Sequence, residues 1–283
     1  MYYIQETDKP VLIARVFNLV EIVNDRIILP IEKDEIIDEK KIKILTKKII
    51  KILDKTNCKT IILSKYLKKN EGFMEKLKSS GLNIIDGKWL FLVMSEKAID
   101  YVVRKKELKK EETNVSILVN NNFNDYILEN IKEIIRKYKT VNIVTKQIEK
   151  FKKIEKQIMD EEGINITITN NKKKSLVRSN IILNVDFDTE LINKYNIPEE
   201  GIIVNLQENV KITKKRFNGI SINDYEIKYQ NYDEYDYEKE KYYDKKDMYE
   251  AMIYKKQPYE YIKRKIDRDK VEIVKLNGNR TVL

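Results

Sequence analysis

The sequence predicts an α/β protein that consists of two α/β units, the second with a mostly parallel sheet, followed by a C-terminal extension. Short apolar, β-branched runs alternate with amphipathic stretches of helical period along most of the chain. The length of 283 residues suffices for about two domains. Near the C-terminus the composition changes, since eleven of the 18 tyrosines lie between Tyr225 and Tyr261. The two units and the extension are therefore expected at residues 1–110, 111–210 and 211–283.

The N-terminal unit is expected to begin with a small antiparallel meander. Three β-branched, apolar runs predict its strands, at residues 11–16, 19–23 and 26–31. Asp34 is suited to cap a long helix, in which apolar residues recur at near-helical spacing from Ile37 to Leu53. The rest of this unit is expected as a strand, a helix, a strand and a long helix, at residues 59–63, 73–79, 82–85 and 89–103.

Strand and helix alternate regularly in the second unit, which is typical of a parallel sheet that is covered on both faces. Five apolar runs predict its strands, at residues 115–119, 141–144, 164–168, 181–185 and 202–206. The helices between them are expected at residues 124–138, from Ile148 to an end at Gly163, and at residues 188–195. The extension adds a last helix at 246–254 and a last strand at 271–276.

Absent and scarce residue types exclude several kinds of site. The chain has no His, which excludes Ser-His-Asp and Cys-His catalysis and every zinc site that contains His. Cys58 is the single cysteine, so an internal disulfide or a site with several thiolates cannot form, and no metal site is expected. No apolar run approaches the roughly 20 residues of a spanning helix, and the start lacks the pattern of a signal peptide. We therefore expect a cytoplasmic protein with no membrane partner.

Two short basic runs flank predicted strand ends within a chain of net charge +10. They consist of Lys172, Lys173, Lys174 and Arg178, and of Lys214, Lys215 and Arg216, with Lys211 and Phe217 beside the second run. Such cations could follow the phosphates of a nucleic acid, with Phe217 stacking on a base. Neither run is long or interleaved with several aromatic residues, and no nucleic-acid-binding motif accompanies them. Solvated loops are the favoured interpretation, and a nucleic-acid partner is the less favoured one.

Four segments of the second unit carry a resemblance to a known family. They are Ser116-Ile117-Leu118-Val119 with the following residues 120–123, residues 141–146, residues 179–185 and residues 201–206. Their layout resembles the nucleotide-binding half of the shikimate dehydrogenase and glutamyl-tRNA reductase group of Rossmann proteins. In that family such segments are the strand before the phosphate loop, the strand that meets the adenosine ribose, the strand toward the nicotinamide and the next central strand. The resemblance implies a Rossmann-like sheet and an NAD(P)-dependent oxidoreductase.

The chain departs from this family at the phosphate loop. A G-x-G-x-x-G loop lets the backbone approach a pyrophosphate, but here the loop contains no glycine and its side chains would crowd a dinucleotide. Asp125 adds a negative charge near the start of the helix. The resemblance implies a cation for the ribose phosphate of NADP just after the second strand, where this chain has Lys146. The candidate cofactor-binding residues are therefore Asn120, Asn121, Asn122, Phe123 and Lys146; the expectation is no cofactor, with NAD(P) as the alternative.

Catalysis in shikimate dehydrogenases uses a Lys and an Asp from the first domain. Here Lys65, Asp86 and Lys88 follow predicted strands and are the candidate catalytic residues. A buried Lys beside a carboxylate can act as an acid or a base. The favoured interpretation is structural, because Asp86 and Gly87 can form a helix cap and turn before Trp89.

Three functional hypotheses remain. The leading one is a Rossmann-like protein that is not catalytic and binds a partner protein or a small ligand. The second is an NAD(P)-dependent oxidoreductase of the shikimate dehydrogenase type with an altered loop. The third is nucleic-acid binding by the two basic runs.

Overall fold

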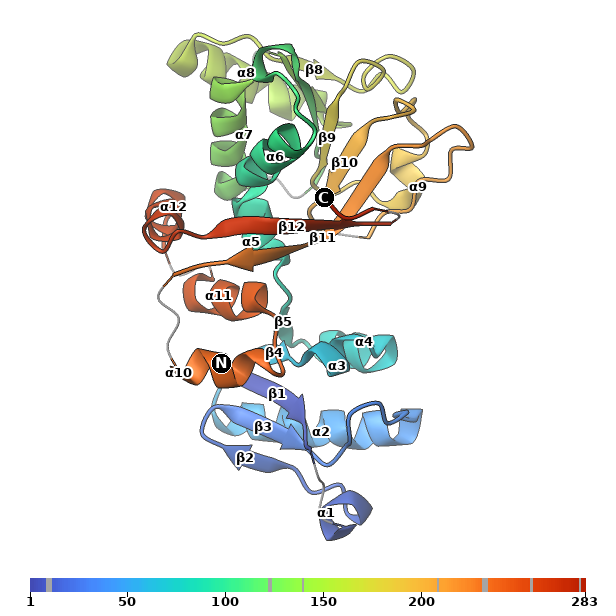
Figure 1. The fold of residues 1–283 in the computed structure, drawn as a ribbon, viewed down its shortest axis with the longest axis vertical. Helices are drawn as coiled ribbons and strands as arrows, with labels where there is room; N and C mark the ends of the chain where they lie inside the picture. The colour runs from blue at the N-terminus through green and yellow to red at the C-terminus, as the bar shows by residue number, and fades with distance from the viewer. Residues whose placement is uncertain are drawn as a thin grey trace. The chain divides into compact units, whose positions relative to one another are not determined.

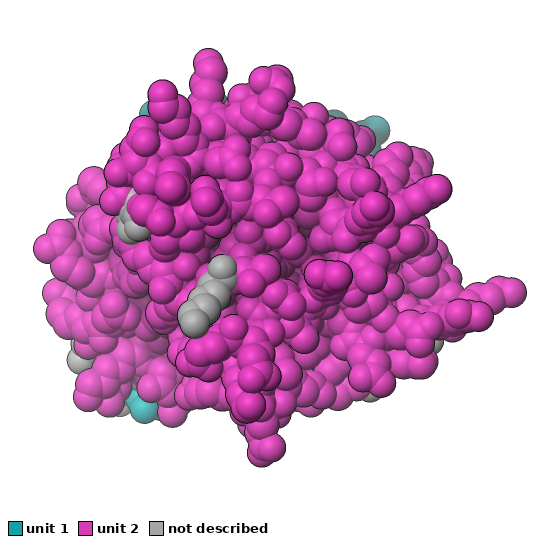
Figure 2. All heavy atoms as spheres, turned by 90° about the horizontal axis from the view of Figure 1, so that it is seen from above, with its two compact units in different colours: residues 1–87, 231–254 teal, residues 88–230, 255–283 magenta. Residues whose placement is uncertain are grey.

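The computed structural model describes residues 1–8, 12–121, 124–138, 140–207, 209–230, 234–254, 257–279 and 281–283. The chain divides into two compact units (Figure 2). Unit 1 comprises residues 1–87 and 231–254, and unit 2 comprises residues 88–230 and 255–283. The sequence predicts boundaries near residues 110 and 210 instead, whereas the chain enters unit 2 at Lys88, returns to unit 1 for residues 231–254 and ends in unit 2. Both units are α/β, which confirms the predicted fold class.

Unit 1 is built on a five-stranded sheet in the order β2-β3-β1-β4-β5 (Figure 1). The strands are β1 (Tyr2–Glu6), β2 (Glu21–Val23), β3 (Arg26–Leu29), β4 (Thr60–Leu63) and β5 (Asn83–Ile85). All neighbouring pairs are parallel except β2 with β3. The helices are α1 (Leu12–Val16), α2 (Glu39–Lys55), α3 (Lys65–Lys68), α4 (Glu71–Ser79), α10 (Glu234–Glu240) and α11 (Lys245–Ile253).

Helices α2 and α11 cover the two faces of this sheet. Leu45 and Ile49 of α2 are fully buried in one core cluster with Ile4, and Met248 of α11 is buried in another with Ile62. Residues of the tyrosine-rich segment thus complete the unit whose sheet is formed by the first 87 residues. The sequence predicts this segment as an extension because its pattern gives no sign of the sheet that it covers.

Two expectations for the start of unit 1 are wrong. Residues 12–16 of the first predicted strand form helix α1, because β1 occupies the place beside β3 that a meander strand would need. Helix α2 is capped by Asp38 and not by Asp34, since the Asp38 side chain accepts a hydrogen bond from the Lys41 backbone N–H at 2.7 Å. Asp34 lies in a turn at a φ of 70°.

Unit 2 is built on a seven-stranded sheet in the order β12-β11-β10-β9-β6-β7-β8 (Figure 1). The strands are β6 (Asn114–Leu118), β7 (Thr140–Val144), β8 (Thr167–Thr169), β9 (Ile181–Asn184), β10 (Ile202–Asn205), β11 (Ile220–Lys228) and β12 (Glu272–Gly278). Six of them are parallel and β12 pairs antiparallel with β11. Numbered from β6 to β11, the parallel strands lie in the order 6-5-4-1-2-3, which is the Rossmann order read from its other edge.

The helices of unit 2 are α5 (Lys88–Val93), α6 (Ser95–Lys105), the 3₁₀ turn η1 (Lys110–Glu112), α7 (Asp125–Lys137), α8 (Ile148–Glu162), α9 (Thr189–Ile192) and α12 (Tyr259–Arg268). The long helix predicted at 89–103 is divided into α5 and α6, because Met94 leaves the helical conformation with a ψ of 14°. Helix α8 ends at Gly163 as predicted, since Gly163 adopts the left-handed conformation with a φ of 68°.

One face of the unit 2 sheet is covered largely by loops. In the described residues, the connections from β8 to β9 and from β10 to β11 contain no helix. We name these connections loop 170–180 and loop 206–219. Leu176 of the first loop and Val210 of the second are buried in one cluster with Ile192 of the short helix α9. These buried apolar side chains take the place of the helices that usually cover this face of a doubly wound sheet.

Candidate functional site

The site that the sequence predicts lies at the carboxyl edge of the unit 2 sheet. In open α/β sheets, ligands bind where the strand order reverses, beyond the carboxyl ends of the strands. In unit 2 this position lies between β6 and β9, which are neighbours in the sheet. Asn120 and Asn121 follow β6, and Asp186 follows β9.

The Asp186 carboxylate binds the backbone of the turn that follows β6. One oxygen accepts a hydrogen bond from the Asn120 backbone N–H at 2.8 Å, and the other accepts from the Asn121 backbone N–H at 2.5 Å. In a dinucleotide-binding Rossmann protein, the backbone N–H groups at this turn face the pyrophosphate. Here two of them already bind an anionic group that belongs to the protein.

The Asn120 side chain closes the same turn against the end of β7. Its Oδ1 atom accepts a hydrogen bond from the Lys146 backbone N–H at 2.8 Å and lies 3.4 Å from the Thr145 hydroxyl. Asn120 is only 6% exposed. The Gln147 side-chain amide donates to the Asn121 side-chain oxygen at 3.2 Å. The structure thus brings Asn120, Asn121 and the Lys146 backbone together, while the Lys146 side chain is exposed.

The remaining candidates of this loop, Asn122 and Phe123, lie outside the described residues. That the side chains of these two residues fill the turn therefore stays a prediction from the sequence. The predicted cofactor-binding role of the whole group likewise stays a prediction.

A buried network of asparagines crosses three neighbouring strands of the sheet. The Asn184 side-chain amide on β9 donates to the Asn205 oxygen on β10 at 2.9 Å. The Asn205 amide in turn donates to the Asn223 oxygen on β11 at 2.9 Å and to the Ser221 hydroxyl at 3.0 Å. Asn184 and Asn205 are each 2% exposed, so these bonds satisfy amides that water cannot reach.

The sequence contains a signal for this network that the spacing of strands and helices does not reveal. Four apolar runs are followed by asparagine in the same way: SILVN at Asn120, IILN at Asn184, IIVN at Asn205 and ISIN at Asn223, although β11 itself continues to Lys228. In neighbouring parallel strands, residues at equivalent register positions become neighbours, as Asn184, Asn205 and Asn223 do. No comparable sequence pattern marks Asp186, because its carboxylate reaches the turn after β6 only when β6 and β9 have paired.

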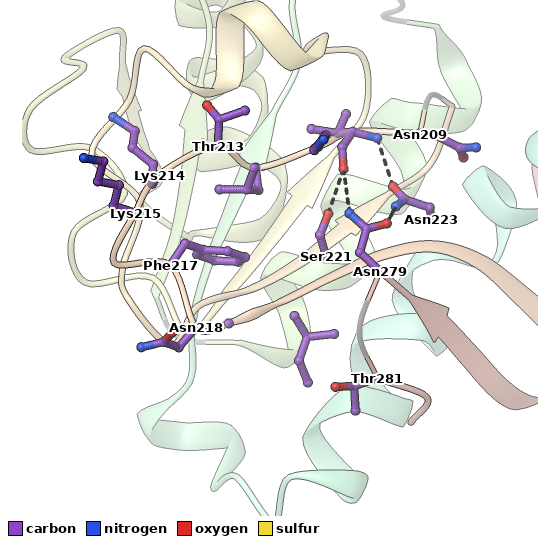
Figure 3. A pocket seen from close by; sticks show the side chains of 15 residues that line it. Asn209, Thr213, Lys214, Lys215, Phe217, Asn218, Ser221, Asn223, Asn279 and Thr281 are labelled. Atoms are coloured by element: carbon purple, nitrogen blue, oxygen red, sulfur yellow. Dashed lines mark hydrogen bonds between the residues drawn. The ribbon is translucent and has the colours of Figure 1, made fainter.

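A pocket of about 570 Å³ lies beneath loop 206–219 (Figure 3). Among the described residues that line it, none is acidic. Figure 3 shows Phe217 between the side of the pocket that carries Lys214 and Lys215 and the side that carries Asn223 and Asn279. We name this site the loop pocket.

The two basic runs are attached to one short segment after α9. The Asn193 side chain donates to the Lys211 carbonyl at 2.9 Å and accepts from the Thr213 backbone N–H at 2.9 Å. Asn196 donates from its backbone to the Lys172 carbonyl at 2.8 Å and from its side chain to the Lys173 carbonyl at 3.2 Å. The structure therefore brings the two runs close together.

The members of the two runs are Lys172, Lys173, Lys174 and Arg178, and Lys214, Lys215 and Arg216. All are exposed except Lys214, which is partly exposed. Within the part of the chain that the structure describes, none of these cations forms an ion pair.

The candidate catalytic residues lie on different elements, with Lys65 at the start of α3. The Lys65 ammonium donates to the Glu240 carbonyl at 2.8 Å and its backbone N–H donates to the Tyr242 carbonyl, so Lys65 attaches the tyrosine-rich segment to unit 1. Asp86 follows β5 in unit 1, whereas Lys88 begins α5 in unit 2.

A different group of charges, which sequence spacing did not indicate, is buried in unit 1. The Lys68 ammonium of α3 forms ion pairs with Asp244 and with Asp247 of α11. Asp247 is fully buried, and its Oδ1 atom has no hydrogen-bond partner among the described residues. Burial raises the pKa of Asp247 to about 7, although Lys68 opposes this. Burial alone would lower the pKa of Lys68, but the two carboxylates outweigh it and raise that pKa.

Two kinds of site are absent from the residues that the structure describes. No group of three or more Cys or acidic side chains among them is placed to hold a metal ion. No helix in the described ranges has the length and apolar character that crossing a membrane requires.

No protein-family model and no curated protein sequence matches the chain. Solved structures are only distantly similar. L-tryptophan dehydrogenase from Nostoc punctiforme has a TM-score of 0.33 and 7% identity, and the match covers 76% of this chain and 65% of that chain, slightly less than two thirds. Shikimate 5-dehydrogenase from Listeria monocytogenes has a TM-score of 0.30 and 12% identity, covering 72% and 77% of the two chains. Ornithine carbamoyltransferase from Pyrococcus furiosus has a TM-score of 0.28 and 12% identity, covering 76% and 74%.

At these low TM-scores the similarities carry no argument about function. The assignment of unit 2 as Rossmann-like rests on its own strand order.

Proposed function

We propose that this chain is a Rossmann-like protein that acts by binding a partner or a small ligand, without dinucleotide-dependent catalysis. The observation that carries this proposal is the pair of hydrogen bonds from the Asn120 and Asn121 backbone to the Asp186 carboxylate. A pyrophosphate at this turn would have to displace a carboxylate that belongs to the same sheet.

The energetics of that exchange are unfavourable for a dinucleotide. Hydrogen bonds to a charged group are worth about 1.5–3 kcal/mol each, and a pyrophosphate could bind these two N–H groups only in exchange for the bonds that they already make to Asp186. The displaced Asp186 carboxylate would remain near the phosphates and repel them. The side chain of Asn120 adds to this, because its bond to the Lys146 backbone holds it where a phosphate loop has glycine.

The test is isothermal titration calorimetry of the whole chain with NAD, NADP and inorganic phosphate, for the wild type and for Asp186→Ala. We expect no saturable binding at the β6 turn of the wild type, and a gain of affinity for inorganic phosphate in the variant, since its backbone N–H groups become available. Asp160→Ala, at an exposed position on α8, is the matched control and should gain nothing.

The alternative, an NAD(P)-dependent oxidoreductase of the shikimate dehydrogenase type, predicts the opposite. It would be supported by saturable binding of NADP to the wild type that weakens in Lys146→Gln. That result would refute the proposal.

A second candidate function is nucleic-acid binding, because Asn193 and Asn196 hold the two basic runs close together. Binding of a single-stranded oligonucleotide, measured by fluorescence anisotropy, should then weaken steeply as salt is added, since each neutralised phosphate releases a counterion. An affinity that stays constant with salt, or no binding at low salt, would exclude this candidate.

A further inference from the structure

One wall of the loop pocket is held rigidly by hydrogen bonds. The Val210 carbonyl accepts from the Ser221 hydroxyl at 3.1 Å, and the Val210 backbone N–H donates to the Asn223 oxygen at 3.0 Å. The Asn223 amide also donates to the Asn279 oxygen at 2.6 Å (Figure 3). Through Asn205 this wall continues into the buried asparagine network, so the pocket does not depend on a free loop for its shape.

Phe217 is held at the opposite side by close packing. A Cβ atom at position 219 would lie 2.7 Å and 2.9 Å from two ring carbons of Phe217 and would overlap the Gly201 carbonyl oxygen. Only glycine therefore allows the ring to approach the backbone this closely. Phe217 also packs against the core cluster beneath α9, which leaves its ring partly buried and partly lining the pocket.

Several polar groups of the pocket have no partner among the residues that the structure describes. Within those residues, Lys214 and Lys215 form no ion pair, and the side chains of Asn209, Asn218 and Thr213 form no hydrogen bond. Pockets that bind small ligands usually combine apolar or aromatic lining with a few such polar groups. The loop pocket has this composition.

We propose that the loop pocket binds a nucleotide, with the phosphate near Lys214 and Lys215, the base on Phe217 and polar contacts from the asparagines. This inference rests on the proposed function, for which it names the ligand class and the place. Lys211, Lys214 and Lys215 line the pocket and favour an anionic ligand, and the flexible stems of the lysines allow their ammonium groups to reach a phosphate.

The ring explains why the ligand should carry a base as well as a phosphate. Aromatic side chains stack on the planar face of any base, and such stacking contributes about 1–3 kcal/mol in known complexes. A pocket of about 570 Å³ falls in the usual range for small-molecule sites, which is roughly 300–1,000 Å³. A simple inorganic anion would use the lysines but neither the ring nor the amides.

The test is calorimetric titration of the full chain with adenosine 5′-monophosphate, adenosine and inorganic phosphate. We expect saturable binding of the monophosphate, weaker binding of adenosine and weaker binding of phosphate. The double variant Lys214→Gln/Lys215→Gln should bind the monophosphate about tenfold less tightly and adenosine unchanged, as expected for two exposed charge contacts. Phe217→Leu keeps an apolar side chain against the core and should weaken the binding of both.

A charge-matched control is available in the same unit. Lys152→Gln/Lys153→Gln removes two exposed lysines of α8 and should leave the affinity unchanged. An equal loss in both double variants would overturn the proposal, because the effect would then be one of net charge. The proposal would also be overturned if the monophosphate did not bind, or if inorganic phosphate bound as tightly as the monophosphate.

Two sources of the nucleotide are distinguished by a short single-stranded RNA. If the RNA binds more tightly than the monophosphate, and if its affinity falls when Lys172, Lys173 and Lys174 are changed to Gln, the source of the nucleotide is a nucleic-acid strand. Equal or weaker binding of the RNA would identify a free nucleotide.

Failure of this inference differs from failure of the proposed function. NAD that binds here through its adenosine half loses affinity in the Lys214→Gln/Lys215→Gln variant. NAD that binds at the β6 turn does not lose affinity in that variant. Such binding would refute the proposed function instead.

Discussion

The buried carboxyl group of Asp247 makes the stability of unit 1 depend on pH, and Asp247→Asn tests this. The pKa of Asp247 is about 7 in the folded chain, against a reference value of 3.8. Between these values the unfolded chain has lost the proton and the folded chain still holds it. The unfolded state is therefore favoured progressively as pH rises from about 4 to 7. At about 1.4 kcal/mol for each pKa unit, the free energy of unfolding falls by about 4 kcal/mol across this range.

Asp247→Asn keeps the size of the side chain and removes its titration. In the variant, Lys68 retains Asp244 as its partner. Burial raises the pKa of Asp244 and Lys68 lowers it, and the net effect is a lowered pKa. Asp244 therefore contributes only below about pH 4, outside the range in question. The variant should lack the fall of about 4 kcal/mol that the wild type shows.

The assay is hydrogen exchange with mass spectrometry on peptides from β4 and α11, because these report the opening of unit 1 alone. Asp54→Asn changes an exposed aspartate of α2 and should keep the pH dependence of the wild type. If Asp247→Asn showed the same slope as the wild type between pH 4.5 and 7, the assignment of the proton to Asp247 would be refuted.

Three further predictions concern unit 2, in which Trp89 provides a fluorescence signal for unfolding in urea. Asp186→Ala should lower the free energy of unfolding by about 2 kcal/mol, since it frees one buried and one exposed backbone N–H, whereas Asp160→Ala should change it by less than about 0.5 kcal/mol. Asn205→Ala should cost about 3 kcal/mol because it leaves several buried groups without partners, and a cost below about 1 kcal/mol would mean that water replaces the network. Gly219→Ala should cost more than Gly163→Ala, since an added Cβ meets backbone and ring atoms at the first position and open space at the second, where only the positive φ costs about 1 kcal/mol; equal costs would contradict the packing described.

The central strands of unit 2 were predictable because local pattern and tertiary environment agree there. Strands β6, β9 and β10 are buried on both faces, so their apolar runs are visible in the sequence without knowledge of the neighbours. Strand β11 was missed because its burial alternates and its charged residues resemble a linker. Its identity as a strand depends on pairing with β10 and with β12, which lies about fifty residues further along the chain.

Strand β1 and helix α1 show the same limit at the start of the chain. The pattern of residues 12–16 favours a strand on propensity alone. The place beside β3 is taken by β1, so this segment has no strand to pair with. Tertiary pairing thus overrides a local preference that was correctly identified.

For the predicted site, the sequence located the turn after β6 but not the carboxylate that binds its backbone. The absence of glycine after β6 was visible, and so was the crowding that the side chains of Asn120 and Asn121 imply. The contact with Asp186 joins residues 66 apart in the sequence, and no spacing rule links them. The ion pairs of Lys68 with Asp244 and Asp247 join residues 176 and 179 apart, for the same reason.

The discontinuity of unit 1 has a consequence for synthesis on the ribosome. The first 87 residues emerge early, but the segment that covers one face of their sheet, with Tyr243 and Met248, emerges only after unit 2 has been largely made. Until then Ile62 and Ile85 on that face stay uncovered, and exposed apolar surface of this kind is prone to aggregation. Unit 1 is completed only by residues 231–254 and unit 2 only by residues 255–283, so both units need the C-terminal part of the chain before either sheet has all its partners.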